Sequence, residues 1–264
     1  MPMRSAKKSI PVKKSVSAKT VQPVVPYFNQ KALDFLRQLK RNNRREWFEA
    51  RREIFETELK APMLALVEKI TQGMMDYAPG HVRPAQKSMM RIYRDTRFSA
   101  DKTPYKTHVA AWWSRVGMEK TSGSGYYFHV SPTELVIAAG VFMPPKDQLL
   151  AIRRHLLAHH EEYKRLIETK KLGTKKLPAR MKPHDTAALT RPPKGFPADH
   201  PAIEWIKGRQ WGVMVTLTSD PALAPKLAET IGSYFRLSQP LVDFLNEPLL
   251  KGMEKRKKPL FGLY

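Results

Sequence analysis

The spacing of apolar residues changes twice along this chain of 264 residues. Up to about residue 75 it follows the 3.6-residue period of an amphipathic helix. Between Ser88 and Phe142 the apolar residues form short aromatic and β-branched runs separated by turn residues, as they do in strands. Helical spacing returns at Pro145. The pattern therefore predicts helices, then a contiguous block of strands, then helices again.

The N-terminal block contains signals for three helices. Asn29 is suited to cap the first of them. The apolar stripe of that first helix consists of Ala32, Phe35, Leu36 and Leu39. Asn43, followed three residues later by Glu46, resembles the capping box of a second helix. Pro62 suits the first turn of a third helix, where its missing N–H has no partner to lose.

The central block predicts an antiparallel sheet. Four segments have the composition of strands, namely 88–94, 108–116, 126–130 and 135–142. The residues between the last two, Ser-Pro-Thr-Glu at 131–134, fit a four-residue hairpin loop. Neighbouring strands without an intervening helix favour antiparallel pairing. A further strand is predicted at 213–217.

The C-terminal part predicts a long surface segment at 170–200, a short helix at 201–208 and a last helix that begins at Asp220 and kinks near Pro240. Helices on both sides of a contiguous strand block define an α+β protein. We therefore predict one α+β domain over residues 26–250. Its antiparallel sheet has about four or five strands and is flanked by the N-terminal and C-terminal helices.

Both ends of the chain are basic. Residues 1–25 contain Lys, Ser, Val and Pro without an aromatic or an acid, so we predict a disordered tail. This tail has no apolar segment typical of a secretory signal. An organellar transit peptide is a weaker alternative, because Lys replaces Arg and because Pro11 and Pro23 interrupt any helix. Residues 251–264 form a second basic tail.

The net charge is +23, of which residues 1–25 contribute +6 and residues 251–264 contribute +4. The part between them is therefore basic in its own right and attracts nucleic acids or phosphorylated molecules. The chain has no cysteine, which excludes disulfides and cysteine-bound metal sites. The absence of cysteine also favours a cytoplasmic location. No run of about eighteen apolar residues occurs, so we predict no transmembrane helix and no membrane partner.

The densest polar cluster is the segment 91–108, RIYRDTRFSADKTPYKTH. Its cations are Arg91, Arg94, Arg97, Lys102 and Lys106. Guanidinium and ammonium groups that converge at a strand end suit a phosphate or a carboxylate. In that interpretation Asp95 and Asp101 hold the cations in place, and His108 carries a proton. The alternative is a salt-bridged turn, in which the two aspartates bind Arg or Lys and no ligand is involved.

A second cluster is RPPKGFPADHP at 191–201. Arg191 is a candidate to complete the anion site, and Asp199 with His200 is a candidate acid–base pair. The simpler alternative is structural. The prolines and the glycine stiffen a turn, and Asp199 or His200 caps the next helix.

Signatures of cofactor and metal chemistry are weak. The chain has no Walker loop, no G-x-G-x-x-G turn and no G-x-S-x-G elbow, so we predict no cofactor. His155, His159 and Glu162 share one face of a predicted helix, and two histidines at this spacing can bind a metal. However, the metal-binding pattern His-Glu-x-x-His is absent, and a helix face exposed to solvent explains the same spacing. We therefore predict no metal site.

Four segments resemble, in composition and order, the domain-of-unknown-function family 2461, a widespread and mostly bacterial group of uncharacterised proteins. They are NNRREWFEARR (42–52), RIYRDTRFSADKTPYKTH (91–108), GYYFHVSP (125–132) and RPPKGFPADHP (191–201). The resemblance spans roughly residues 27–248 and implies one domain from end to end. It implies no reaction, because the family has no established activity. The two tails and the Lys-rich stretch 170–182 look like additions to the family pattern.

The leading interpretation is an uncharacterised protein that binds an anionic small molecule, bearing phosphate or carboxylate, in a basic pocket built around residues 91–108. Arg191 is a further candidate ligand-binding residue. The alternatives are a non-specific nucleic-acid-associated protein, an enzyme acting on a phosphorylated or nucleotide substrate, and a scaffold in which the motif residues are structural. The candidate catalytic residues are Asp95, His108 and His200. Whether the protein is an enzyme stays open at this point.

Overall fold

The computed structural model describes residues 24–118, 122–168, 177, 179–184 and 188–257. Within them, helices precede and follow a five-stranded sheet, in the order that the spacing of apolar residues predicts. The prediction of a disordered tail at residues 1–25 falls almost wholly outside the described residues, and so does the second half of the tail at 251–264.

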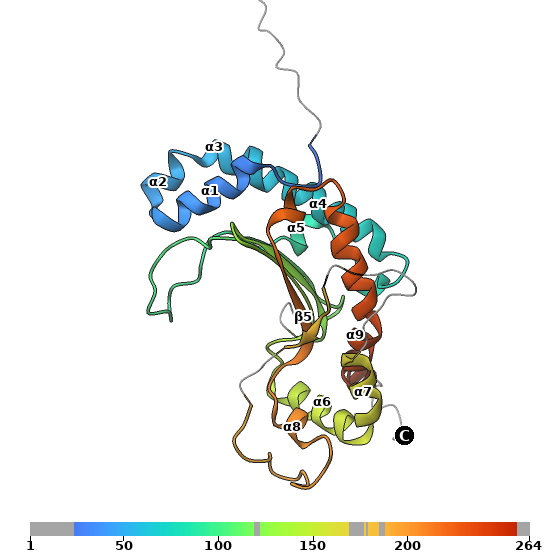
Figure 1. The fold of residues 1–264 in the computed structure, drawn as a ribbon. Helices are drawn as coiled ribbons and strands as arrows, with labels where there is room; N and C mark the ends of the chain where they lie inside the picture. The colour runs from blue at the N-terminus through green and yellow to red at the C-terminus, as the bar shows by residue number, and fades with distance from the viewer. Residues whose placement is uncertain (1–23, 119–121, 169–176, 178, 185–187, 258–264) are drawn as a thin grey trace, which may run out of the picture.

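The sheet is antiparallel throughout, with the strand order β1-β2-β3-β5-β4 (Figure 1). The strands are β1 (Val109–Trp113), β2 (Gly125–Val130), β3 (Glu134–Val141), β4 (Lys182–Pro183) and β5 (Trp211–Thr218). The predicted fold class and strand number are confirmed. Strand β4 lies within the predicted surface segment 170–200, and both of its residues are exposed. Its two residues pair with Met214 and Val213 of β5, although Lys and Pro are poor strand formers.

The prediction of a strand at 88–94 is wrong. The short helix α5 (Ala85–Ser88) ends there, and Met89 forms only an isolated bridge to β1. Further along, Tyr93 forms an isolated bridge to Tyr105 of the same segment, so this part of the chain folds back on itself. Aromatic and β-branched residues suit any pleated pairing, and the composition does not reveal which partner the chain chooses.

One face of the sheet packs against the two long helices α4 (Ala61–Met74) and α9 (Leu227–Lys257). At the centre of this contact, the buried ring of Trp113 lies 5.9 Å from that of Phe128 and 5.5 Å from that of Phe235. Burial of such rings is a main source of folding free energy. The buried residues of the helices and of the sheet form one continuous core, as expected for a single domain.

The N-terminal helices form an arm ahead of α4. They are α1 (Gln30–Arg41), α2 (Arg45–Glu49), α3 (Arg52–Ile54) and the π-helix η1 (Phe55–Lys60). The predicted cap of α1 is confirmed, because Asn29 Oδ1 accepts a hydrogen bond from the backbone N–H of Ala32 at 3.0 Å. The predicted place of Pro62 in the first turn of α4 is also confirmed.

The predicted capping box of Asn43 and Glu46 is wrong. Helix α2 has no side-chain cap, and the side-chain amide of Asn43 binds a distant peptide group. Its Nδ2 donates to the carbonyl of Tyr105 at 2.9 Å, and its Oδ1 accepts from the N–H of Tyr105 at 3.0 Å. The ring of Tyr105 stacks on that of Phe48 at 4.2 Å. These contacts anchor the segment 91–108 on the arm.

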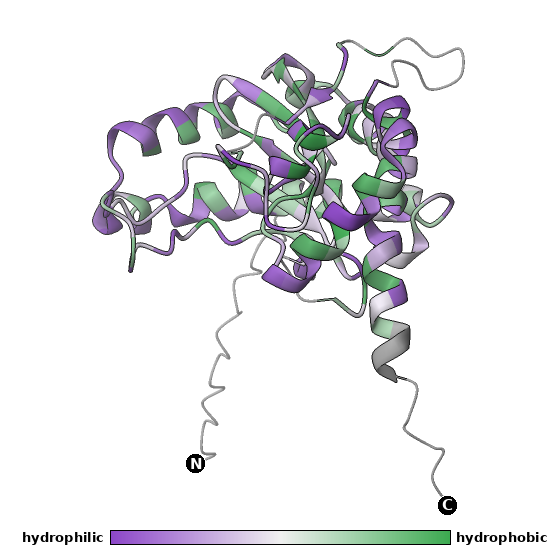
Figure 2. Cartoon of the chain, turned by 90° about the horizontal axis from the view of Figure 1, so that it is seen from below, coloured by the Kyte–Doolittle hydropathy of each residue, from purple (hydrophilic) through white to green (hydrophobic). Residues whose placement is uncertain are grey.

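The remaining helical elements are η2 (Pro79–His81), α6 (Lys146–Ala158), α7 (His160–Ile167), α8 (Ile203–Lys207) and η3 (Asp220–Leu223). The last helix does not begin at Asp220 as predicted. The chain forms the 3₁₀ turn η3 there, and α9 begins at Leu227 and continues through Pro240 and Pro248 to Lys257. Hydrophilic and hydrophobic residues alternate along the helices (Figure 2), as expected when one side packs and the other meets water.

The helices divide unequally between the two sides of the sheet. In Figure 1, α4 and α9 lie to the right of the sheet, whereas α1 to α3 extend to the left, above the segment 91–108. Among the described elements, no helix packs on the middle of the left-hand face. None of the described helices is long and apolar enough to cross a membrane. Among the described elements, the left-hand face of the sheet is therefore largely uncovered.

Candidate functional site

Alternate strand residues point to the uncovered face, which we call the open face. The strand register aligns one row across β1, β2, β3 and β5, made of Trp112, Tyr127, Ala138 and Met214. The next row, toward the β2–β3 turn, is made of Ala110, His129, Val136 and Thr216. The two rows thus place a tryptophan, a tyrosine and a histidine together on a face whose middle is covered by none of the described helices.

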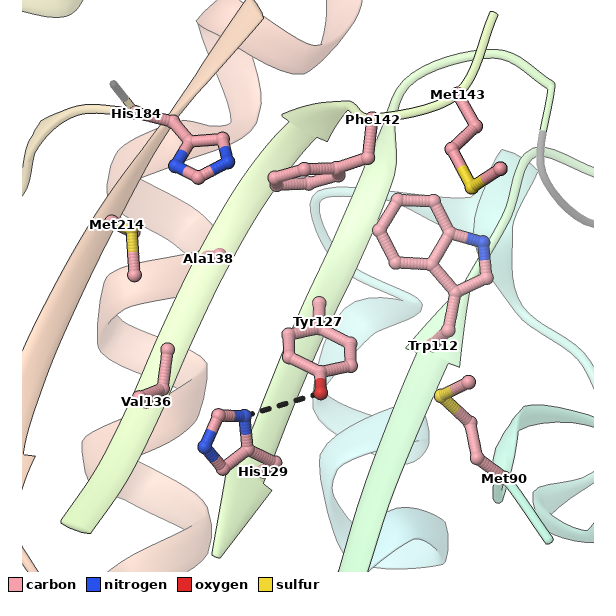
Figure 3. Close-up of a pocket in the computed structure, with 10 residues that line it drawn as sticks. All are labelled: Met90, Trp112, Tyr127, His129, Val136, Ala138, Phe142, Met143, His184 and Met214. Atoms are coloured by element: carbon pink, nitrogen blue, oxygen red, sulfur yellow. Dashed lines mark hydrogen bonds between the residues drawn. The ribbon is translucent and has the colours of Figure 1, made fainter. Parts of the chain in front are cut away.

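An apolar hollow of about 330 Å³ lies over the first of these rows (Figure 3). The ring of Trp112 lies 5.8 Å from that of Phe142, which lies 5.3 Å from that of His184. Ala138 is the smallest residue in its row, and its short side chain leaves space between the larger side chains of Tyr127 and Met214. We call this cavity the apolar hollow. It is lined by Met90, Trp112, Tyr127, His129, Val136, Ala138, Phe142, Met143, His184 and Met214.

His129 is held from both ring nitrogens at one end of this hollow. Its Nδ1 lies 3.1 Å from the hydroxyl of Tyr127, and its Nε2 lies 3.5 Å from a carboxylate oxygen of Glu134. Figure 3 shows the first of these contacts inside the hollow. The ring of His108 lies 4.8 Å from that of His129. Two imidazoles therefore lie side by side where β1 and β2 approach the β2–β3 turn.

A second, polar hollow of about 620 Å³ adjoins this end of the sheet. Helix α1 closes it from above, because Arg37 donates to the carbonyl of Pro132 in the β2–β3 turn at 3.4 Å. Lys40 and Arg41 are exposed at its rim, and neither side chain forms an ion pair with another described residue. We call this second cavity the basic hollow. It is lined by Arg37, Lys40, Arg41, Thr107, His108, His129, Ser131, Pro132, Thr133 and Glu134.

Burial keeps the two histidines neutral near pH 7. It lowers the pKa of His108 to about 4, with smaller contributions from His129 and Lys106. Burial also lowers the pKa of His129, against the opposing effect of Glu134. The pKa of Tyr127 is raised to about 12 by burial, so its hydroxyl keeps its proton. The site therefore presents neutral imidazole and hydroxyl groups beside the permanent charges of Lys40 and Arg41, whereas the guanidinium of Arg37 forms an ion pair with Asp34.

Most cations predicted in the segment 91–108 bind partners within the segment itself. Arg94 forms an ion pair with Asp101 and also donates to Thr103 at 2.6 Å. Arg97 forms a bidentate pair with Asp95, at 3.0 and 2.8 Å. Lys102 donates to the carbonyl of Thr96 at 3.0 Å. These contacts match the alternative of a salt-bridged turn for the tip of the segment.

The other predicted residues of this segment differ in position. Arg91 is exposed, and its charge helps to lower the pKa of Asp95 to about 2, after the larger effect of Arg97. Asp95 is thus ionised at neutral pH and cannot donate a proton there. Lys106 lies close enough to His108 to lower its pKa. His108, at the end of the segment, is the predicted residue that lines the basic hollow.

The second predicted cluster lies elsewhere. In Figure 1 the chain at 188–202 hangs below the sheet beside α8, whereas the segment 91–108 lies beside the N-terminal arm. Arg191 is exposed. His200 accepts a hydrogen bond from the N–H of Ala202 at 3.1 Å, immediately before α8. This bond matches the structural alternative for His200, and the fold does not bring the two clusters together.

The predicted helix that carries His155, His159 and Glu162 is interrupted, because α6 ends at Ala158 and α7 begins at His160. The rings of His155 and His159 lie 4.6 Å apart, and His155 Nε2 lies 3.7 Å from a carboxylate oxygen of Glu247. The ring of His155 also packs against Phe244 at 4.3 Å. Among the described residues, no group of three or more His, Cys, Asp or Glu side chains is arranged to hold a metal ion.

Sequence reasoning missed most of the site. Tyr127 and His129 occupy alternate positions of the segment YYFHV, so their common face was available from the strand period. The basic residues Lys40 and Arg41 gave no such signal, because they end a helix whose position above the sheet depends on tertiary packing. The residue pattern at 108–116 predicts a strand for Trp112 but does not indicate on which face of the sheet its ring lies.

The fold and the site define an α+β protein with an antiparallel sheet. The apolar hollow and the basic hollow lie next to each other on one face of this sheet and share His129. The family described as "Conserved hypothetical protein (DUF2461)" matches residues 31–244. The chain belongs to this family, as the motifs at 42–52, 91–108, 125–132 and 191–201 indicate. No curated protein matches the chain.

Proposed function

We propose that this protein binds a small molecule that joins an apolar body to a phosphate or carboxylate group. The ligand occupies the apolar hollow and the basic hollow together, which we call the cleft. The observation that carries the proposal is the position of His129, which lines both hollows. One molecule placed across His129 reaches aromatic rings on one side and cations on the other.

Each hollow suits a different part of such a ligand. An apolar body leaves water for a lining made largely of aromatic, methionine and aliphatic side chains. An anionic group meets Lys40 and Arg41, together with a ring N–H of His108, whereas the N–H of His129 is directed at Glu134. Glu134 is the acid that opposes an anion here, and its contact with His129 directs it toward the imidazole.

The predicted residues of the segment 91–108 contribute in different ways. His108 belongs to the cleft, and the cations of the segment raise the positive potential beside it. Arg94 and Arg97 hold the tip of the segment together through their ion pairs. Arg191 lies at the far end of the sheet and is not part of the cleft. The cytoplasmic location stays a prediction.

Titration calorimetry with paired probes tests the proposal. 1-Naphthyl phosphate and octyl phosphate carry both parts of the ligand, whereas 1-naphthol lacks the anion and inorganic phosphate lacks the apolar body. We expect the two-part probes to bind more tightly than either single part. The double variant Lys40→Gln/Arg41→Gln should weaken them about tenfold or more, since hydrogen bonds to charged groups contribute about 1.5–3 kcal/mol.

Arg154→Gln/Lys164→Gln is the matched control, because it removes two exposed positive charges from α6 and α7, outside the cleft. This control should leave affinity within about twofold at 150 mM salt, where distant charges are screened. Equal losses in both double variants would show a non-specific effect of net charge. No binding of any two-part probe would contradict the proposed function.

A further inference from the structure

The lining of the apolar hollow selects among possible apolar bodies. Five of its members carry aromatic or imidazole rings on the open side of the sheet, namely Trp112, Tyr127, His129, Phe142 and His184. Three more are methionines, whose sulfur atoms make favourable contacts with ring edges. Only Val136 and Ala138 are aliphatic. A planar aromatic group gains ring contacts on every side of this hollow, whereas an alkyl chain gains contact area alone.

The arrangement of rings on a sheet resembles the way proteins bind unpaired bases. Sheets that bind single-stranded nucleic acid present exposed aromatic side chains on which bases stack. Here Trp112 and Tyr127 are directly opposed on β1 and β2, and Phe142 closes the end beyond β3. The polar atoms nearby are those of His184, His129 and the Tyr127 hydroxyl, which suit the polar edge of a base.

The basic hollow then lies where the phosphate of the same molecule belongs. A nucleotide connects its base to its phosphate through a single sugar, so the two parts need adjoining sites. His129 provides that junction. Further exposed arginines lie outside the hollow, with Arg44 and Arg45 on the arm and Arg91 on the nearby segment. Such cations suit the phosphates of neighbouring nucleotides.

We propose that the cleft binds a nucleotide unit, with its base over Trp112 and Tyr127, between Phe142 and His129, and its phosphate at Lys40, Arg41 and His108. This inference rests on the proposed function and specifies the ligand. The unit is either a free nucleotide or one residue of a single-stranded nucleic acid, since both offer an aromatic base joined to a phosphate.

Titration calorimetry on the full chain tests the inference with five probes: adenosine 5′-monophosphate, uridine 5′-monophosphate, a single-stranded decamer of uridylate, ribose 5-phosphate and octyl phosphate. We expect at least one of the three nucleotide probes to bind about tenfold or more tightly than ribose 5-phosphate and octyl phosphate, as base stacking implies. A mononucleotide as tight as the decamer identifies the free nucleotide as the source. A decamer tighter by tenfold or more identifies the single strand.

Phe142→Leu removes one ring and keeps an apolar side chain of similar size. It should weaken the nucleotide probe about tenfold and leave octyl phosphate unchanged. Phe196→Leu, a partly buried ring in the distant 188–202 chain, is the matched control and should change neither. The panel on the native chain decides the matter even if a variant folds poorly.

The two proposals fail in different ways. Octyl phosphate that binds as tightly as every nucleotide probe would overturn the nucleotide inference and leave the proposed function intact. If neither the nucleotides nor octyl phosphate bind, both proposals fall. Nucleotide binding that Phe142→Leu does not weaken, while Lys40→Gln/Arg41→Gln abolishes it, would also overturn the inference, because the base would then lie outside the apolar hollow.

Discussion

Replacing Asn43 with alanine removes both hydrogen bonds that hold the peptide of Tyr105 on the N-terminal arm. A side-chain hydrogen bond contributes about 1 kcal/mol, and an unpaired buried peptide group costs about as much again. Tyr105 as a whole is 1% exposed, so water reaches its backbone N–H and carbonyl poorly. We therefore expect Asn43→Ala to lower the free energy of unfolding by about 2–3 kcal/mol.

Urea unfolding followed by circular dichroism measures this loss directly, and thermal unfolding provides a second measure. For a domain of this size, about 2–3 kcal/mol corresponds to a fall in Tm of roughly 4–12 °C. Asn42→Ala is the matched control. Asn42 makes a single exposed side-chain hydrogen bond, from Nδ2 to the carbonyl of Gln38 at 3.0 Å, so its loss should cost about 0.5 kcal/mol.

The same substitution should affect the cleft, because Thr107 and His108 follow Tyr105 closely and line the basic hollow. Affinity for 1-naphthyl phosphate should therefore fall in Asn43→Ala and not in Asn42→Ala. If Asn43→Ala and Asn42→Ala are equally stable within about 0.5 kcal/mol, the Asn43 amide does not anchor the segment, and the reasoning fails.

Three further predictions concern acid stability, the sheet and the polar segment. The free energy of unfolding should fall as pH drops from about 6.5 to about 4, because the unfolded chain protonates His108 at an ordinary pKa while the folded chain keeps it neutral down to about 4; His108→Gln should flatten this slope in urea titrations at several pH values. Gly140→Ala should destabilise the fold by about 1–3 kcal/mol or more, because Gly140 has φ +146° and a Cβ there would lie 2.2 Å from the carbonyl oxygen of Trp211; a smaller loss in urea unfolding would show that the strand pair adjusts. Arg94→Lys should cost about 1 kcal/mol of stability by losing contacts to Asp101 and Thr103, yet change the affinity for 1-naphthyl phosphate less than twofold; a selective loss of affinity would place Arg94 in the binding site.

The fold was predictable because its signals are local. The helical stripe before residue 75, the switch to strand spacing and the return to helical spacing each follow from side-chain period alone, and the hairpin at 131–134 follows from turn chemistry. The errors occurred where a partner distant in sequence decides the structure. Asn43 has the sequence context of a cap, but the peptide of Tyr105, 62 residues away, competes for its amide.

The site was less predictable than the fold, because it is built by juxtaposition. The high charge density of the segment 91–108 predicts a binding site there, yet Arg94 and Arg97 form their ion pairs with aspartates of the same segment. The cleft instead combines the end of α1 with alternate residues of β1, β2 and β3. Strand period indicated that Tyr127 and His129 share a face, but nothing in the sequence reveals that this face is left open.

The central claim is that the apolar hollow and the basic hollow bind one ligand together. The most direct test is the affinity of 1-naphthyl phosphate for the native chain, Ala138→Phe, Lys40→Gln/Arg41→Gln and the combined triple variant. Ala138→Phe fills the apolar hollow, whereas Thr216→Phe, its control on the same face, lines neither hollow.

We predict that Ala138→Phe and Lys40→Gln/Arg41→Gln each weaken binding about tenfold or more and that Thr216→Phe does not. Lys40→Gln/Arg41→Gln and Thr216→Phe, which change exposed residues, should unfold within about 1 kcal/mol of the native chain. Ala138 is 3% exposed, so Ala138→Phe should itself cost about 1–3 kcal/mol of stability. Binding that survives either Ala138→Phe or Lys40→Gln/Arg41→Gln unchanged would contradict the account, because the ligand would then lie in one hollow alone or in neither.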